Sequence, residues 1–191
     1  MVDLAKVEQA TRLLLEGIGE DPNRPGLLET PQRVARMWQE LVAGMDQKAS
    51  DIMKAIPVED YDEIILVRDI PMVSICEHHL VPFIGRAHVA YLPSKGKVTG
   101  LSKLARIVEM EARKLQLQER MTAAIADDIM NSLESRGVMV VVEAEHLCMT
   151  IRGAQKPGTV TVTSVVRGQF RSNQATRAEA LALLARDRGR L

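Results

Sequence analysis

The fold is decided by the stretch Val138-Met139-Val140-Val141-Val142, whose valine-rich composition is typical of a strand. Further along, Val160-Thr161-Val162-Thr163 alternates apolar and polar side chains with the period of two that strands have. Strand-like pieces also occupy residues 64–67, 72–74 and 87–91. Because these short strands follow one another in groups without crossover helices, antiparallel pairing is favoured. The sequence predicts a four-stranded antiparallel sheet.

Two helices are expected between the early and the late strands. The first is predicted to begin at Ser102, an N-cap after Gly100, and the second runs on from about Glu119 to a C-terminal cap at Gly137. The order of strands, two helices and strands predicts an α+β layer in which both helices cover one face of the sheet. The other face is expected to be bare and to be buried by association with further copies. The apolar residues at helical spacing are Leu104, Ile107 and Val108 in the first helix, and Met121, Ile125, Ile129 and Leu133 in the second.

The N-terminal part of the chain is expected to be helical and to pack outside the sheet. Apolar residues recur at helical spacing over residues 4–18, and a second helix is predicted from an N-cap at Thr30, which precedes a proline, to Gly44. We therefore divide the chain into an N-terminal helical extension, residues 1–60, and a main domain, residues 61–191, in one compact unit. A last helix is expected from Thr176 onward.

Composition excludes several classes of function. The chain has 191 residues, of which 46% are apolar, so it can bury a proper core. Its 25 basic and 25 acidic residues balance, which argues against a nucleic-acid binder or a polybasic membrane anchor. No apolar signal core or membrane-spanning stretch is evident, so a soluble, cytoplasmic protein is expected. In a reducing cytoplasm, two cysteines are more often metal ligands than a structural disulfide.

The cysteines and histidines gather in two short stretches, Cys76-Glu77-His78-His79 and His146-Leu147-Cys148. Cys76 and His79 have a spacing that lets one turn present two zinc ligands, and Cys148 is the candidate for a third. Three protein ligands with one open position are typical of catalytic zinc. The other readings are a disulfide, buried apolar cysteines, histidines that satisfy core hydrogen bonds, and a structural zinc site closed by a fourth ligand. His78 and His146 fit a ligand, a partner of a ligand or a proton carrier equally well.

Several separated motifs resemble those of the GTP cyclohydrolase I family. They cover nearly the whole chain in the family's order, and the clearest departure is Val160, where the family often has a polar or basic residue. The resemblance implies a zinc enzyme that converts GTP and water into 7,8-dihydroneopterin triphosphate and formate. It also implies the tunnelling fold, in which sheets of several subunits join into a barrel, commonly a decamer of two pentamers. The matching motifs are residues 74–83, 100–106, 117–120, 143–149 and 152–156, together with the N-terminal segment 19–34.

The resemblance also assigns roles to single residues. It implies that Cys76, His79 and Cys148 bind Zn²⁺, that His78 protonates the purine N7, and that His146 moves protons in later steps. Glu119 matches the carboxylate that accepts two hydrogen bonds from guanine, and Gln118 matches a residue that contacts the base or the ring. Without the resemblance, both would be read as solvated residues at a helix start. The family's phosphate-binding positions correspond to Lys103, Arg106 and Arg152, and residues of adjoining subunits complete each site. Ser102 is added as a further phosphate contact, because a hydroxyl and backbone N–H groups at a helix N-terminus suit an anion.

One enzymatic alternative shares the tunnelling fold. A reductase of a deazaguanine nitrile uses a cysteine as a covalent nucleophile together with a nicotinamide cofactor, and needs no zinc. The paired Cys and His motifs argue against it, and metal analysis separates the two readings.

Overall fold

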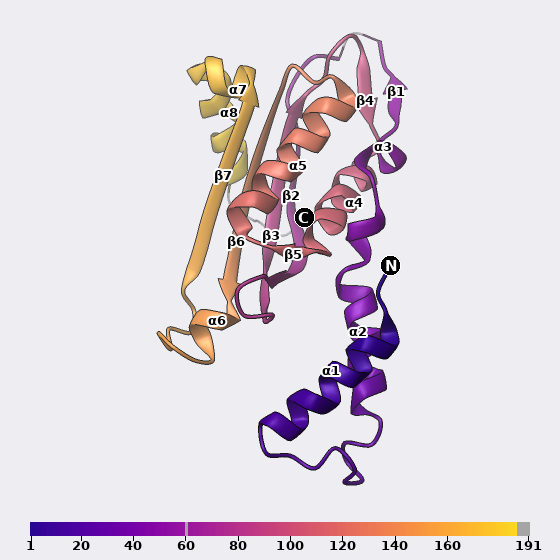
Figure 1. Cartoon of the computed structure of the whole chain (residues 1–191). Coiled ribbons are helices and arrows are strands. Elements are labelled where there is room, and N and C mark those ends of the chain that lie inside the picture. The colour runs from indigo at the N-terminus through magenta and orange to yellow at the C-terminus, as the bar shows by residue number, and fades with distance from the viewer. Residues whose placement is uncertain (60, 187–191) are drawn as a thin grey trace.

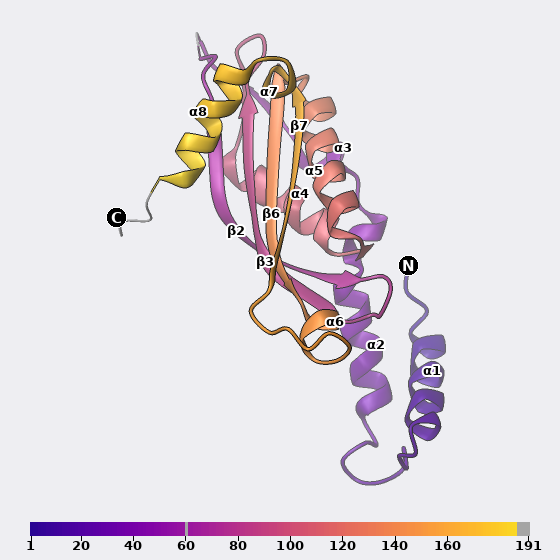
Figure 2. The same ribbon diagram turned by 90° about the vertical axis from the view of Figure 1, so that its left-hand side faces the viewer.

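The centre of the structure is a curved, mostly antiparallel β-sheet that lies between two layers of helices (Figure 1, Figure 2). The computed structural model describes residues 1–59 and 61–186. The long strands pair antiparallel in the order β2-β3-β6-β7, which confirms the predicted sheet, and a short β5 runs parallel to the outer edge of β2. The strands are β2 (Ile65–Cys76), β3 (Pro82–Leu92), β5 (Leu115–Gln116), β6 (Gly137–His146) and β7 (Val160–Gly168).

Two long helices, α4 (Leu101–Ala112) and α5 (Gln118–Leu133), cover one face of the sheet, as predicted. Their apolar stripes meet the inward side chains of β3 and β6 in the main core, where Phe83, Ile107 and Ile125 are fully buried. Each side chain of this size stabilises the fold by about 1.5–3 kcal/mol through its removal from water. The α+β fold class is therefore confirmed.

The opposite face of the sheet is not bare, which corrects the expectation from the sequence. Two helices, α7 (Gln169–Ser172) and α8 (Gln174–Ala185), fold back over part of it (Figure 2), and α8 begins slightly before the predicted Thr176. Phe170 and Ala180 pack there against Leu92 and Met139 in a second buried cluster. Since helices lie on both faces, the first six residues of β6 are all buried and do not alternate.

The N-terminal helices lie beyond one end of the sheet (Figure 1). Helix α1 (Leu4–Gly17) packs mainly on α2 (Thr30–Leu41), and the chain then passes through the short helices η1 (Ala43–Asp46) and α3 (Ala49–Ile52). Strand β1 (Ala55–Pro57) pairs with β4 (Lys97–Thr99) in a small second sheet. Residue 60 and the end of the tail lie outside the described residues, and the division at residues 60 and 61 stays a prediction. No helix among the described residues is both long and apolar enough to cross a membrane.

Two predicted N-caps are wrong by one or two residues. Thr30 lies inside α2, and Glu29 occupies the capping position without a side-chain hydrogen bond. Gly100 caps α4, so Ser102 lies in the first turn of that helix. In both cases the helix begins earlier than the polar residue suggests, which leaves the Ser102 hydroxyl exposed on the helix surface.

Two further boundaries differ because of contacts distant in sequence. The C-cap of α5 is Glu134, which adopts the left-handed conformation with φ of 50°. The predicted cap, Gly137, begins β6 instead. A Cβ at Gly137 would lie 3.1 Å from the backbone nitrogen of Gln169, so close packing favours a glycine here. The predicted strand pieces 64–67 and 72–74 form one strand, β2, which continues through an irregularity between Val67 and Ile70.

Candidate metal and active site

The first ligand-bearing segment is the turn that joins β2 to β3, residues 77–79, which we call the metal turn. Cys76 closes β2, and its backbone accepts a hydrogen bond from Leu80 N–H at 2.9 Å and donates one to the Val81 carbonyl at 2.9 Å. Leu80 has a φ of 55°, which lets the chain reverse direction within a few residues. The backbone thereby holds His79 on the same side of the sheet end as Cys76.

The second ligand-bearing segment follows β6. In the register between β3 and β6, Phe83 is paired with His146, so the end of β6 lies beside the start of β3 and the metal turn. Cys148 lies two residues further on, in the short helix α6 (Leu147–Thr150). The ligand atoms of Cys76, His79 and Cys148 all lie within 4.8 Å of one another, and both cysteines are free thiols. The structure therefore brings together the three residues that the sequence singled out, and gives no disulfide.

The donor set fits a zinc ion. Two sulfur atoms and one imidazole nitrogen are ligands that Zn²⁺ prefers. Burial, and then the nearby Cys76, raise the pKa of the Cys148 thiol, because two thiolates so close together repel each other. A divalent cation between the two sulfur atoms would remove this repulsion and stabilise both thiolates. The three side chains thus form a group that becomes favourable when it holds a metal.

His146 is held in one orientation by Gln118. The Gln118 side chain is 1% exposed, and its Nε2 lies 3.0 Å from the Val142 carbonyl and 3.1 Å from both the Thr161 carbonyl and Thr163 Oγ1. Its Oε1 therefore faces the Nε2 atom of His146 at 2.8 Å. Since an amide oxygen only accepts, His146 carries its proton on Nε2 and leaves Nδ1 as the acceptor.

The environment of the His146 ring favours its neutral form. The ring stacks on Phe83, with centroids 4.6 Å apart and planes inclined by 6°. Burial lowers the pKa of His146, while the nearby Glu119 carboxylate acts in the opposite direction. A neutral imidazole with a free Nδ1 is suited to accept a proton.

These groups line one cavity of about 240 Å³ at the end of the sheet. His78 and His79 extend from the metal turn into its exposed side, their rings meeting edge to face with centroids 6.2 Å apart. Glu119 lies exposed in the first turn of α5. Arg152 belongs to the same neighbourhood, since its guanidinium lies 3.0 Å from His79 Nε2. One chain thus gathers both cysteines, three histidines, Gln118, Glu119 and Arg152.

Three predicted phosphate-binding residues, Ser102, Lys103 and Arg106, do not join this group. They lie in the first half of α4, whereas the C-terminal end of that helix leads into β5 beside the metal turn. The twelve residues of α4 rise about 18 Å, so its first turn lies far from the metal ligands. Arg106 instead lines a separate cavity of about 520 Å³ with Ile84 and Glu109. Within the described part of one chain, the site lacks these cations.

Two residues near the site were missed in the sequence. Arg120 contacts the carboxylate of Glu77 in the metal turn, and Gln116 contacts Arg120 in turn. Their only signal was position: Arg120 ends the motif at residues 117–120, and Gln116 directly precedes that motif. His88, the fourth histidine, lies apart from this cavity: it is buried and lines a different one with Arg68 and Glu143.

An α+β fold that gathers two thiols and several histidines around one cavity is the arrangement of an enzyme with a candidate metal site. Comparison with known proteins narrows this class. The family model for GTP cyclohydrolase I matches residues 7–185. The chain belongs to the GTP cyclohydrolase I family, which confirms the resemblance.

The similarity extends over nearly the whole length of curated relatives. The GTP cyclohydrolase 1 of Carboxydothermus hydrogenoformans is 60% identical over 184 residues, which cover 96% of each chain. The GTP cyclohydrolase 1 of Geobacillus kaustophilus is 58% identical over 183 residues, covering 96% of this chain and 97% of the relative. Among solved structures, the archaeosine synthase QueF-Like covers 56% of this chain at 13% identity with a TM-score of 0.46, too distant to inform the site.

Proposed function

We propose that this protein is a zinc-dependent GTP cyclohydrolase I. It opens the imidazole ring of GTP at C8, releases formate and forms 7,8-dihydroneopterin triphosphate. The observation that carries the proposal is the approach of Cys76, His79 and Cys148 to within 4.8 Å, in a cavity that also holds His78 and His146. When bound there, zinc supplies Lewis acidity that lowers the pKa of a bound water to about 7.

The histidines divide the proton transfers between them. His78 lies on the exposed side of the cavity, where an imidazolium can deliver a proton to the departing N7 of the purine. His146 is neutral and presents Nδ1 as an acceptor, because Gln118 occupies its Nε2–H. It is therefore arranged to take up protons during the later rearrangement of the ribose. The reaction needs a proton donor when the ring opens and a proton acceptor when the ribose rearranges. His78 is placed for the first role and His146 for the second.

Recognition of guanine is assigned to Glu119. A carboxylate can accept both the N1–H and the 2-amino hydrogen of guanine, and no other common side chain offers two such acceptors. Glu119 lines the same cavity as the metal ligands and is exposed, so its oxygens are available to a base. Gln118 lies one residue before Glu119, but its amide group is already hydrogen-bonded to His146 and to the Val142 carbonyl of the sheet. We therefore assign Gln118 an indirect part in substrate binding, through His146.

The triphosphate requires more cations than one chain brings to the cavity. Arg152 lies beside His79, where it can contact the triphosphate. We assign the remaining phosphate contacts to Ser102, Lys103 and Arg106 of a neighbouring copy. The sheet supports such an arrangement. β7 is an edge strand with Val160 and Val162 exposed, and β2 pairs with β5 only at Ile75 and Cys76. Pairing of these open edges would join copies into a ring.

A larger assembly follows from the N-terminal helices. The α1 and α2 pair exposes apolar side chains beyond the end of the sheet, which suits packing of two rings face to face, as in a decamer of two pentamers. The exposed residues are Leu13, Leu14, Ile18, Leu28 and Met37. A cytoplasmic location is part of the proposal, since the two thiols must stay reduced to bind zinc.

The function is tested by incubating the purified protein with GTP while formate release and pterin fluorescence are followed, with and without a chelator. We expect both signals in the zinc-loaded protein, loss of both after chelation, and recovery when zinc is returned. A nitrile reductase would instead consume a reduced nicotinamide and ignore the chelator. A zinc scaffold would change its assembly on chelation without ever producing formate.

A further inference from the structure

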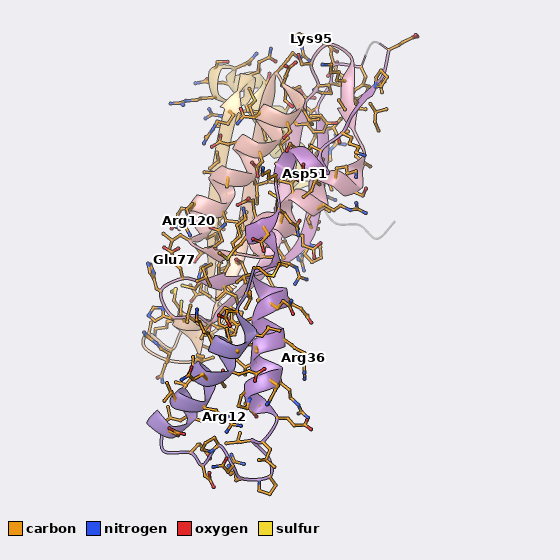
Figure 3. The ribbon with its side chains drawn as sticks, turned by 45° about the vertical axis from the view of Figure 1, so that its right-hand side comes forward. Arg12, Arg36, Asp51, Glu77, Lys95 and Arg120 are labelled. Atoms are coloured by element: carbon orange, nitrogen blue, oxygen red, sulfur yellow. The ribbon has the colours of Figure 1, made fainter. Side chains whose placement is uncertain are left out.

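The metal turn is held from outside by a side chain of α5. Glu77 lies between the ligand Cys76 and the two histidines of the turn, and its carboxylate forms an ion pair with the guanidinium of Arg120. Figure 3 shows Glu77 and Arg120 close together on one side of the molecule. The residues are 43 positions apart in the sequence, so this contact ties the turn to a separate helix.

Arg120 is itself fixed by two further contacts. Its Nε donates to Gln116 Oε1 at 3.1 Å, and its terminal nitrogen donates to the Leu115 carbonyl at 2.8 Å. A planar guanidinium with three partners in different directions has little rotational freedom. It can therefore impose a position on Glu77, although its side chain is 51% exposed.

Gln116, the residue that fixes Arg120, is itself buried. Gln116 is 3% exposed, and its Nε2 donates to the Glu111 carbonyl at 2.9 Å and lies 3.3 Å from Glu111 Oε2. These contacts turn Oε1 toward Arg120. The backbone of the same residue also acts on the turn, because the Gln116 carbonyl accepts a hydrogen bond from Glu77 N–H at 3.1 Å. Glu77 is thus held at its backbone and at its carboxylate by one small unit.

We propose that Gln116 and Arg120 are positioning residues for the metal: acting through Glu77, they hold the metal turn in the shape that keeps Cys76 and His79 at ligand distance from Cys148. Neither residue belongs to the proposed ligand set, and neither is needed to contact substrate for this role. A turn that is already ordered loses less freedom when it binds an ion, so the ion binds more tightly. The inference rests on the proposed ligands Cys76, His79 and Cys148, but not on the identity of the substrate.

The test measures zinc affinity without any turnover, by competition with a chromophoric chelator. Arg120→Leu keeps the aliphatic part of the side chain and removes all three contacts. We expect it to weaken zinc binding about 10-fold, the lower end of the effect of removing a partner of a metal ligand. Arg120→Lys, which keeps a charge for Glu77 but cannot reach Gln116 as well, should recover part of the loss.

The matched control is Arg113→Leu. Arg113, the C-cap of α4, also donates to a carboxylate, Glu109, and to a backbone carbonyl, that of Glu40, but neither partner belongs to the metal turn. Its zinc affinity should equal that of the parent protein. In the cobalt-substituted proteins, the visible absorption bands should shift in Arg120→Leu and stay in place in Arg113→Leu, because only the first change alters ligand geometry.

A double-mutant cycle tests whether Arg120 acts on the metal site through Glu77. If Arg120 acts through Glu77, then Glu77→Ala should weaken zinc binding to a similar extent, and the double variant should be little worse than either single one. Glu77→Ala lies in an exposed turn, so it keeps the test open should Arg120→Leu fail to fold. Parent-like zinc affinity and cobalt spectra in Glu77→Ala, or fully additive effects in the double variant, would overturn the positioning role. A parent protein that binds no zinc would instead overturn the proposed function.

Discussion

Nε2 of His146 lies 2.8 Å from Oε1 of Gln118, and the same glutamine amide serves two strands of the sheet on its other side. Gln118→Leu would leave the Val142 and Thr161 carbonyls and the imidazole without this partner in a buried place. We expect the free energy of unfolding to fall by about 3 kcal/mol. Urea denaturation at fixed protein concentration measures it.

Thr163→Val is the control for Gln118→Leu. It removes one neighbour of the amide and one partner of the Thr122 hydroxyl, which keeps its bond to the Gln118 carbonyl, and it leaves both carbonyls and His146 satisfied. The free energy of unfolding should fall by about 1 kcal/mol or less. Equal losses in the two variants would mean that the contacts of the amide with the two carbonyls and His146 contribute little.

Cys148→Ser should remove most of the bound zinc. A serine hydroxyl is a poor substitute for a thiolate at neutral pH, and the site would keep only Cys76 and His79. Metal content after dialysis, measured by elemental analysis, should fall well below one ion per chain, and formate release should fall with it. Full metal content with normal turnover would take Cys148 out of the ligand set.

Glu119→Gln should weaken the discrimination between purines. An amide keeps one acceptor but turns a donor toward the guanine hydrogens, so we expect kcat/KM for GTP to drop roughly 100-fold, which corresponds to about 3 kcal/mol. Inosine triphosphate lacks the 2-amino group and should lose less. The ratio of the two kcat/KM values is the measurement, and an unchanged ratio would assign base recognition to another residue.

Asp128 predicts a pH-dependent stability that is independent of the metal. Burial is the largest cause that raises its pKa to about 6, followed by the charge of Glu111, with Asp127 adding slightly and Lys114 opposing. The folded state therefore holds a proton that the unfolded chain releases near its ordinary pKa of 3.8, so stability falls as the pH rises from about 4 to about 6. Asp128→Asn should melt at a higher temperature than the parent at pH 8, by less at pH 5, and at a similar temperature only at or below about pH 4. Because Asp128 is partly exposed, the difference should be modest.

Asp127→Asn serves as the comparison for this pH series. Asp127 pairs with Arg167 at 2.7 Å, on the side of α5 that faces β7. Removal of this ion pair in Asp127→Asn should not raise the melting temperature at pH 8. A pH-independent difference in Asp128→Asn would show that the Asp128 carboxyl is ionised throughout the range.

Sites shared between copies predict complementation. Cys148→Ser damages the metal site, and Lys103→Ala damages the phosphate contacts that we assign to a neighbouring chain. Each variant alone should release little formate, but mixed assemblies should contain some sites with both residues intact and recover part of the activity. Co-expression with two tags and purification through both gives the mixed assemblies. Recovery no greater than the sum of the separate variants would place Lys103 in the same site as Cys148 of its own chain, or outside it.

The candidate metal ligands could be grouped from the sequence because their chemistry is rare. Two cysteines and closely spaced histidines in a chain of this size stand out by type, and local spacing was enough to group Cys76 with His79. Gln116 and Arg120 could not be found in this way. They are common residue types, and their importance comes from contacts with Glu77 that only the folded chain creates.

The strands show a similar limit. Arg68, Asp69 and Pro71 resemble an interruption between two short strands, yet β2 continues through them. Asp69 adopts a φ of 60°, and its N–H donates to Nδ1 of the buried His88 at 3.1 Å. The last helix was predicted from its composition. The face of the sheet that it covers depends on the packing of Phe170 and Ala180 against β3 and β6. Tertiary packing, which local patterns do not encode, decided both outcomes.

The placement of the ligands also bears on how long the protein survives. Cys76 and His79 sit where β2 turns into β3, whereas Cys148 follows β6, so an ion held by all three fastens the tips of three neighbouring strands. Without it, this end of the sheet would lose that link, and local opening exposes backbone to proteases. We therefore expect the zinc-free protein to be degraded faster than the zinc-bound protein.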